Sequence, residues 1–143
     1  MAPSTTETLA HTPIDVHWID GLTFEAGRPQ GPKVRLDGDA QKSPGPFDLL
    51  LAAIASCAAV DVVTILAKQR TPVHALGVRV EARRVDSTPR RLASVVLHFR
   101  IAAPGSTQRT ATRAVELSVT KYCSVRSSLI ADAPVSWTVE LDA

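Results

Sequence analysis

Apolar and polar residues alternate in two stretches in the middle of the chain, and such alternation is typical of β-strands with one buried face. In residues 76–85 and 92–102, every second side chain is apolar over most of the length. Residues 86–89, Asp-Ser-Thr-Pro, have the composition of a turn, so the two strands are expected to form a hairpin. A shorter alternating stretch at 135–141 predicts a strand near the C-terminus.

Shorter alternating segments near the N-terminus predict a small β-meander. The expected strands are residues 14–20, 22–26 and 33–36. Residues 27–32 contain two glycines and two prolines, as expected for the turn before the last of these strands. Residues 1–12 offer little to bury and are expected to form a flexible arm, with residues 13–143 as one domain.

The longest apolar run predicts a helix over residues 46–68. Pro46 suits a first helical turn, Asp48 complements the positive end of the helix dipole, and Lys68 suits the C-terminal end. The run is apolar nearly all round, so we expect the helix to be covered on several sides. A chain of 143 residues offers few ways to do this, which favours help from a second subunit. Asp48 and Asp61 argue against a membrane span.

A second helix is expected after Thr107, which is a plausible N-cap residue. Apolar residues at helical spacing continue it to about Thr120, and a shorter helical segment reaches Ile130. The order is therefore meander, long helix, hairpin, second helix and C-terminal strand. Because strands and helices are grouped rather than strictly alternating, the fold class is α+β.

Charge and composition exclude several classes of function. The chain has 16 Lys and Arg against 14 Asp and Glu, a net charge of +2, and its basic residues are scattered. Nucleic-acid binding usually needs a clustered basic surface, and aromatic residues for base stacking make up only 4% here. The histidines lack metal-ligand spacing, so no metal is expected. With no signal peptide or membrane span predicted, a cytoplasmic protein is expected.

Two cysteines are the candidates for chemistry. Cys57 lies in the middle of the apolar helix, where a free cysteine is commonly a small buried hydrophobe. Cys123 has a more polar setting, in which Lys121 and Arg126 could stabilise a thiolate. From the residues alone, two idle thiols and a redox pair both remain open.

Two motifs in order resemble those of the OsmC/Ohr family. Residues 46–57 resemble its central-helix pattern Pro-x-(Glu/Asp)-Leu-Leu-Leu-Ala-Ala-Leu-(Ala/Gly)-x-Cys, which carries a peroxide-reactive cysteine. Residues 113–123 resemble its second motif, which ends in Lys-Tyr-Cys. The resemblance extends over about residues 14–141. It is closer to the OsmC-like branch than to the dedicated organic-hydroperoxide-resistance branch.

This resemblance implies an intertwined homodimer and a thiol peroxidase that reduces organic hydroperoxides, and hydrogen peroxide less well. It implies that Cys57 attacks the peroxide, becomes a sulfenic acid and then forms a disulfide with Cys123. An external thiol or dithiol would reduce the disulfide, with no metal or organic cofactor.

The resemblance also implies an arginine near the reactive thiolate, held in the hydroperoxide-resistance branch by a glutamate. Phe47 occupies the position of that glutamate and Asp48 follows it, so Asp48 is a candidate for this role or for a helix-dipole role. Arg28 is the candidate cation, and Arg35 is its competitor. Asp61 lies one turn after Cys57 on the same helix face, where a carboxylate would disfavour a thiolate.

Two other functions remain as alternatives. The first is a dimeric module that binds a small ligand or senses oxidation, without efficient turnover. The second is acyl transfer through a thioester on Cys57, for which no histidine is placed as a base.

Overall fold

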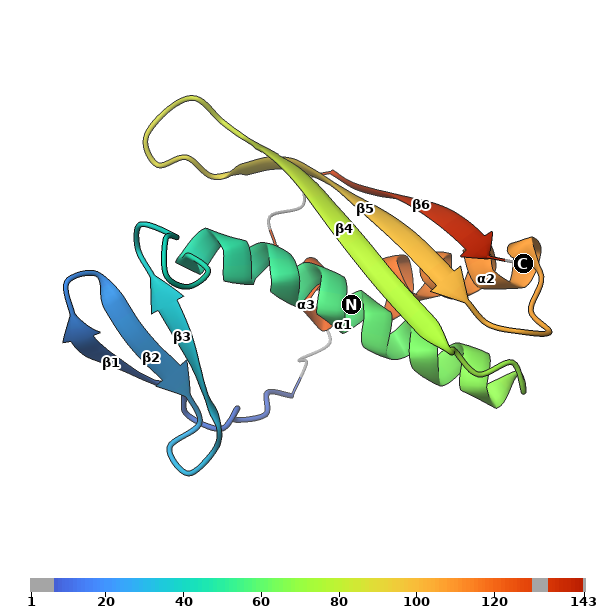
Figure 1. Ribbon diagram of the computed structural model, residues 1–143, viewed down its shortest axis with the longest axis horizontal. Coiled ribbons are helices and arrows are strands. Elements are labelled where there is room, and N and C mark those ends of the chain that lie inside the picture. Colours follow the sequence, from blue (N-terminus) through green and yellow to red (C-terminus); the bar gives the residue numbers. More distant parts are fainter. Residues whose placement is uncertain (1–6, 130–133, 143) are drawn as a thin grey trace, which may run out of the picture. The chain divides into compact units, whose positions relative to one another are not determined.

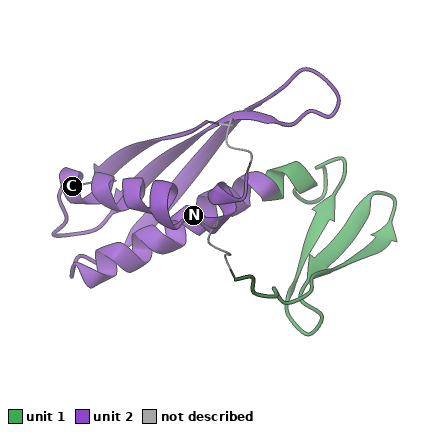
Figure 2. Cartoon of the chain, turned by 180° about the vertical axis from the view of Figure 1, so that it is seen from behind, with its two compact units in different colours: residues 1–49 green, residues 50–143 purple. Residues whose placement is uncertain are grey.

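A computed structural model describes residues 7–129 and 134–142 of the chain. It divides into two compact units, residues 1–49 and 50–143, and the boundary falls within the first helix (Figure 2). Residues 7–14 contain no helix or strand. The flexible arm over residues 1–12 stays a prediction, and its first six residues lie outside the described part. The single domain over residues 13–143 stays a prediction.

The N-terminal unit contains the predicted β-meander. Strands β1 (Asp15–Asp20), β2 (Thr23–Gly27) and β3 (Lys33–Asp37) form an antiparallel sheet in chain order (Figure 1). The tight turn between β1 and β2 needs a glycine, because Gly21 adopts a φ of 49° in the left-handed region. Trp18 remains 65% exposed although its indole Nε1 donates to the carbonyl of Gly21.

A carboxylate at the end of β3 organises the loop that leads into the long helix. Asp37 is buried and accepts hydrogen bonds from the backbone N–H groups of Lys42 at 3.0 Å, Asp39 at 3.0 Å and Gln41 at 3.1 Å. The bonds from Lys42 and Asp39 lower the pKa of this carboxyl most strongly. The loop is therefore held by an ionised side chain rather than by regular structure.

The C-terminal unit is a mixed sheet with helices on one face. Strands β4 (Ala75–Arg84) and β5 (Leu92–Ala102) form the predicted antiparallel hairpin, and β6 (Val135–Asp142) pairs with β5 in parallel. Figures 1 and 2, seen from opposite sides, show the helices on the same face of this sheet. A parallel pair requires a long crossover connection, and this connection carries the remaining helices.

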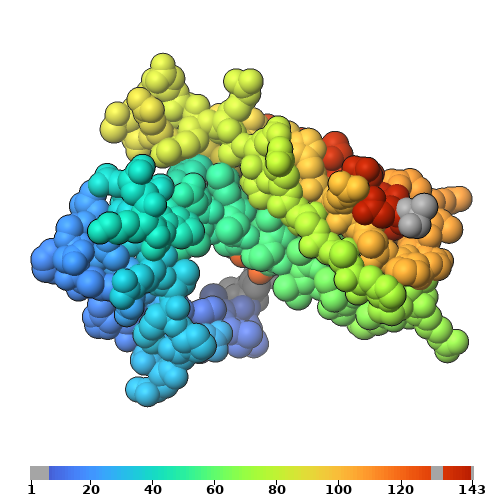
Figure 3. Space-filling view, viewed as in Figure 1, coloured from blue at the N-terminus to red at the C-terminus, as the bar shows by residue number. Residues whose placement is uncertain are grey.

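The long helix α1 runs from Pro46 to Lys68, as predicted. It buries one face, formed by Ile54, Ala55, Ala58, Val62 and Leu66. The opposite face stays open in this chain, with Val60 64% exposed. Part of the surface of α1 is visible in green in the space-filling view (Figure 3). The expected coverage on several sides is thus not provided by the described residues of one chain. By length and mean hydropathy (2.4) α1 also resembles a membrane-spanning helix, as apolar core helices do.

The core of the C-terminal unit lies between α1, α2 (Gln108–Leu117) and the inner face of β5. The alternation predicted for β5 is confirmed over most of its length, because Val95, Leu97, Phe99 and Ile101 are buried and Arg100 is exposed. The buried side chains of this core include those of Leu97, Phe99, Ile101, Ala111, Ala114 and Val115.

The end of the second helix differs from the prediction. Thr107 caps α2 as expected, because its hydroxyl accepts from the backbone N–H of Thr110 at 3.1 Å. However, α2 ends at Leu117 and a π-helical turn, η1 (Ser118–Tyr122), replaces the expected α-helical continuation to Thr120. The short helix α3 (Ser124–Ser127) follows, and the expected end at Ile130 lies outside the described residues.

The wider turn of η1 has a local explanation in two adjacent inward-facing residues. Ser118 and Val119 are both buried, and the hydroxyl of Ser118 donates to the carbonyl of Ala114 at 2.7 Å. A serine that bonds back to the preceding turn disturbs regular α-helical geometry, and π-helical turns of this kind often occur at functional sites. Here η1 ends at the residue directly before Cys123.

Candidate redox site

The two cysteines lie together in the C-terminal unit as free thiols. Cys57 occupies the middle of α1 and is half-buried, whereas Cys123 is only 3% exposed. The two cysteines are 66 residues apart in the chain. The crossover connection between β5 and β6 brings Cys123 back to α1. The two thiols lie close enough for each to shift the pKa of the other.

Cys123 is fixed by contacts on both sides of its sulfur. Its Sγ accepts from the backbone N–H of Arg126 at 3.3 Å, so the thiol serves as the N-cap of α3. The same Sγ lies 3.9 Å from the carbonyl oxygen of Ile54, one turn before Cys57 on α1. The start of α3 is thereby held against α1 next to Cys57.

The surroundings of Cys57 favour its thiolate. Burial raises the pKa of Cys57, but hydrogen bonds from the backbone of Val125, the thiol of Cys123 and Ser124 outweigh burial and lower the pKa below its ordinary value. The hydroxyl of Ser124 lies 3.9 Å from the sulfur. These donors belong to the N-cap and first residues of α3.

The pKa of Cys123 is shifted in the opposite direction, upward. Burial raises the pKa of the Cys123 thiol most strongly, the backbone N–H of Arg126 opposes this, and the adjacent Cys57 sulfur raises the pKa further. The thiolate is therefore more favoured at Cys57 than at Cys123, where the protonated thiol is favoured. This is the asymmetry expected of an attacking and a resolving cysteine.

Removing a donor should raise the pKa of Cys57. We expect wild-type Cys57 to be alkylated by iodoacetamide with a pH midpoint below that of free cysteine, because only the thiolate reacts. In Ser124→Ala the midpoint should move upward, whereas the exposed neighbouring change Ser56→Ala should leave it in place. Mass spectrometry of the labelled peptides reports each thiol separately, and an unchanged midpoint in Ser124→Ala contradicts this account.

Asp48 makes the contact expected of a helix-capping acid. Its Oδ2 accepts from the backbone N–H of Gly45 at 2.8 Å, within the loop before α1. This favours the helix-dipole interpretation over the orientation of an arginine, although the latter role stays untested.

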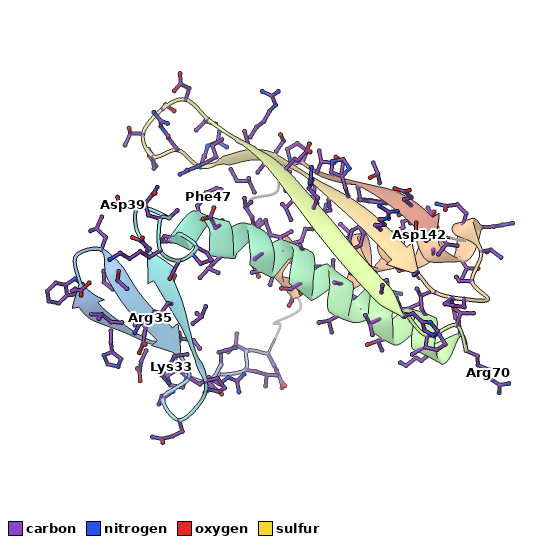
Figure 4. All side chains as sticks on the ribbon, viewed as in Figure 1. Lys33, Arg35, Asp39, Phe47, Arg70 and Asp142 are labelled. Atoms are coloured by element: carbon purple, nitrogen blue, oxygen red, sulfur yellow. The ribbon has the colours of Figure 1, made fainter. Side chains whose placement is uncertain are left out.

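The two candidate arginines lie in the N-terminal unit. Arg35 lies on β3 (Figure 4). It is opposite Glu25 on β2, and its Nε lies 3.3 Å from the carboxylate Oε1. Arg28 lies in the turn between these strands, where its carbonyl accepts from Gly31 and from the ammonium of Lys33. The assignment of Arg28 as the activating cation stays a prediction.

The donors at the start of α3 were missed by the sequence analysis. A signal was present, because a serine directly follows Cys123 and small polar residues are common at helix starts. What the sequence lacked was the position of α3 beside α1. In residues 7–129 and 134–142, no three His, Cys, Asp or Glu side chains form a group that could hold a metal ion.

The fold and the paired thiols agree with the resemblance stated from the motifs. A family model described as OsmC-like protein matches residues 38–139, and the chain belongs to this family. It is 37% identical over 111 residues to Protein YhfA of Escherichia coli strain K12, in an alignment covering 77% of this chain and 83% of YhfA.

Solved structures show the same fold. An OsmC-like protein from Mycoplasma pneumoniae superposes with a TM-score of 0.79 at 17% identity, over 94% of this chain and 99% of that one. A structure from Legionella pneumophila, described as an organic hydroperoxide resistance protein OsmC, gives a TM-score of 0.67 at 18% identity. That match covers 94% of this chain and 99% of the Legionella chain. The predicted α+β, OsmC-like fold is thus confirmed.

Proposed function

We propose that the protein is a thiol peroxidase that reduces organic hydroperoxides through Cys57. The observation that carries this proposal is the pair of free thiols held together between α1 and the start of α3, in which the pKa is lowered at Cys57 and raised at Cys123. Membership of the OsmC-like family adds support, because structures of similar fold carry organic hydroperoxide resistance in their descriptions.

The chemistry requires only sulfur and the peroxide. The Cys57 thiolate attacks the outer peroxide oxygen, the O–O bond breaks, and the alkoxide takes a proton and leaves as an alcohol. Cys57 is then a sulfenic acid. The Cys123 sulfur attacks it, the disulfide forms, and the hydroxyl leaves with the Cys123 proton as water. Two external thiols, or one dithiol, return both cysteines to the reduced state, so no metal or organic cofactor takes part.

An organic peroxide suits the surroundings of Cys57. Leu50, Leu51 and Val60 are half-buried or exposed on α1, within about two turns of the thiol. Burying alkyl surface contributes about 25 cal/mol per Å², which hydrogen peroxide cannot use. We therefore propose organic hydroperoxides as the better substrates.

We also propose the cytoplasm as the site of action, where free thiols persist.

Turnover distinguishes this enzyme from a sensor or binding module. With an organic hydroperoxide and excess dithiothreitol, we expect many molecules of peroxide to be consumed per protein, at higher kcat/KM than with hydrogen peroxide. A module that only senses oxidation would consume one equivalent and stop. Loss of a single equivalent, followed by no further reaction in the presence of reductant, would sink the enzyme proposal.

We also propose that the working form is a homodimer. The open face of α1 includes Val60 and Val63, which are 64% and 45% exposed in a helix of high mean hydropathy. Exposed apolar patches of this kind mark interaction surfaces. Sedimentation at low micromolar concentration should give about 31 kDa, twice the chain mass of 15.3 kDa. A soluble monomer with one cooperative melting transition is the result that contradicts a dimer.

A further inference from the structure

Ser124 differs from two other serines of the same segment in the partner of its hydroxyl. The hydroxyls of Ser118 and Ser128 each donate at 2.7 Å to the carbonyl of the residue four positions earlier. Serine side chains in helices commonly form such bonds. Among the described residues, the hydroxyl of Ser124 has one hydrogen-bond partner, the sulfur of Cys57 at 3.9 Å. Its hydrogen is therefore available to a molecule that reaches Cys57.

The backbone on both sides of Ser124 is held in place. The preceding residue, Cys123, caps α3 through its sulfur, which accepts from the backbone N–H of Arg126 at 3.3 Å. The carbonyl of Ser124 accepts from the backbone N–H of Ser128 at 3.0 Å and from the Ser128 hydroxyl. The hydroxyl of Ser124 is thus presented to Cys57 from a fixed backbone, as a preorganised donor requires.

Attack on a peroxide moves negative charge away from the sulfur. In the free protein, the hydroxyl of Ser124 and the nearby backbone N–H groups favour the Cys57 thiolate. As the O–O bond breaks, the sulfur loses its charge and the leaving oxygen gains it. A donor lowers the barrier only if it binds this oxygen more strongly than it binds the sulfur before attack.

A hydroxyl can follow this movement of charge, whereas a backbone N–H cannot. The hydroxyl hydrogen rotates about its C–O bond and turns toward the stronger acceptor. The separation of 3.9 Å from the sulfur is long for a hydrogen bond, and catalytic hydrogen bonds often tighten only when the substrate is bound. In a line of attack from Cys57, the leaving oxygen lies beyond the transferred oxygen. A donor set away from the sulfur is therefore suited to reach it.

From this geometry we propose that Ser124 is a further catalytic residue, whose hydroxyl donates a hydrogen bond to the leaving oxygen of the peroxide. The Cys57 thiolate supplies the electron pair of the new S–O bond and is oxidised to the sulfenic acid. The O–O bond breaks and the peroxide is reduced to an alkoxide. Ser124 keeps its proton, and water supplies the proton that converts the alkoxide to the alcohol. This inference rests on the proposed peroxidase function and assigns a group to its first step.

Two peroxides with different leaving groups test this role. tert-Butyl hydroperoxide releases a strongly basic alkoxide, whereas peracetic acid releases acetate, a weak base that needs little help from a donor. The assay is run above the alkylation midpoints of both proteins, so that Cys57 is a thiolate in each. Ser124→Ala should then lower kcat/KM for tert-butyl hydroperoxide about tenfold or more, and kcat/KM for peracetic acid by no more than about twofold. In a cycle through an oxidised enzyme, kcat/KM for the peroxide reports the oxidation step.

Threonine and valine at this position separate the hydroxyl from the shape of the side chain. Ser124→Thr should keep kcat/KM for tert-butyl hydroperoxide within about threefold of the wild type, whereas Ser124→Val should lose activity as Ser124→Ala does. The matched control Ser127→Ala changes an exposed serine of α3 and should keep the wild-type rates. Circular dichroism confirms that each variant is folded, and either hydroxyl-free variant carries the test if the other is not.

Alkylation at the same pH distinguishes an effect on the sulfur from an effect on the leaving oxygen. Iodoacetamide has no oxygen leaving group, so Ser124→Ala should change the rate of labelling of the Cys57 peptide by no more than about twofold. An equal decrease in kcat/KM for the two peroxides overturns the proposal, whether or not alkylation also slows. An unchanged kcat/KM for tert-butyl hydroperoxide in Ser124→Ala overturns it as well, but leaves the peroxidase function standing. A wild type without turnover of any peroxide in dithiothreitol is the different result that removes the proposed function itself, and this inference with it.

Discussion

Replacing Cys57 with serine is expected to lower peroxide consumption by about a thousandfold or more, to the rate without protein. A serine hydroxyl is not ionised at neutral pH and cannot accept the peroxide oxygen to form a reducible intermediate. The measurement is the loss of an organic hydroperoxide with excess dithiothreitol.

Ser56→Ala is the matched control for this variant. Ser56 is the exposed neighbour of Cys57, and its hydroxyl lies 3.4 Å from the carbonyl oxygen of Ala53. We expect this change to leave the rate within about twofold, as for most surface substitutions. If Cys57→Ser retained turnover, another group would have to carry the oxidation, and the thiol pair would lose its assigned role.

Replacing Cys123 with serine should give a different failure. Attack by Cys57 is retained, but the sulfenic acid has no resolving thiol and should be oxidised further to the sulfinic state. We expect one equivalent of peroxide to be consumed rapidly, followed by inactivation and a gain of about 32 Da at Cys57 as excess peroxide reacts. The wild type should instead lose about 2 Da on disulfide formation.

Intact-mass spectrometry after stepwise peroxide addition shows which thiol reacts first. If Cys123 were oxidised first in the wild type, or if Cys57 stayed unmodified in Cys123→Ser, the two roles would be assigned the wrong way round. Two idle thiols would give neither pattern, since they would oxidise slowly and independently. As a control for prior oxidation, a sample is alkylated before peroxide is added, so that its mass shows whether both cysteines are free thiols.

The elements with strong local signals were predictable from the sequence. The bounds of α1 follow from Pro46 at its start, Lys68 at its end and an unbroken apolar run between them. The hairpin of β4 and β5 follows from a period-two alternation on either side of a turn. Thr107 was identified as the N-cap of α2 because its hydroxyl suits the first free backbone N–H groups.

The turn η1 could not be predicted in this way. Local propensity continues the helix to about Thr120, because none of the residues there is a helix breaker. The wider turn places both Ser118 and Val119 in the core, and such a requirement comes from the packing of α2 against the rest of the unit. Tertiary packing of this kind overrides a single-residue preference.

The candidate site was predictable in part. The motifs identified Cys57 and Cys123, which the structure brings together, and they directed attention to arginines for the stabilising charge. The structure adds backbone and hydroxyl donors of Ser124 and Val125 that act on Cys57. Such donors are invisible in a sequence, since every residue has a backbone N–H and only the fold decides where it points.

The position of Cys123 relative to Cys57 also depends on the number of residues in η1. Each residue added to or removed from a helix rotates everything after it by about 100°. A deletion or insertion between Leu117 and Cys123 that the turn does not absorb by changing its width would therefore turn the thiol away from Cys57. During divergence of related chains, exposed positions such as Thr120 and Lys121 are therefore free to change in identity, whereas insertions and deletions here would be selected against.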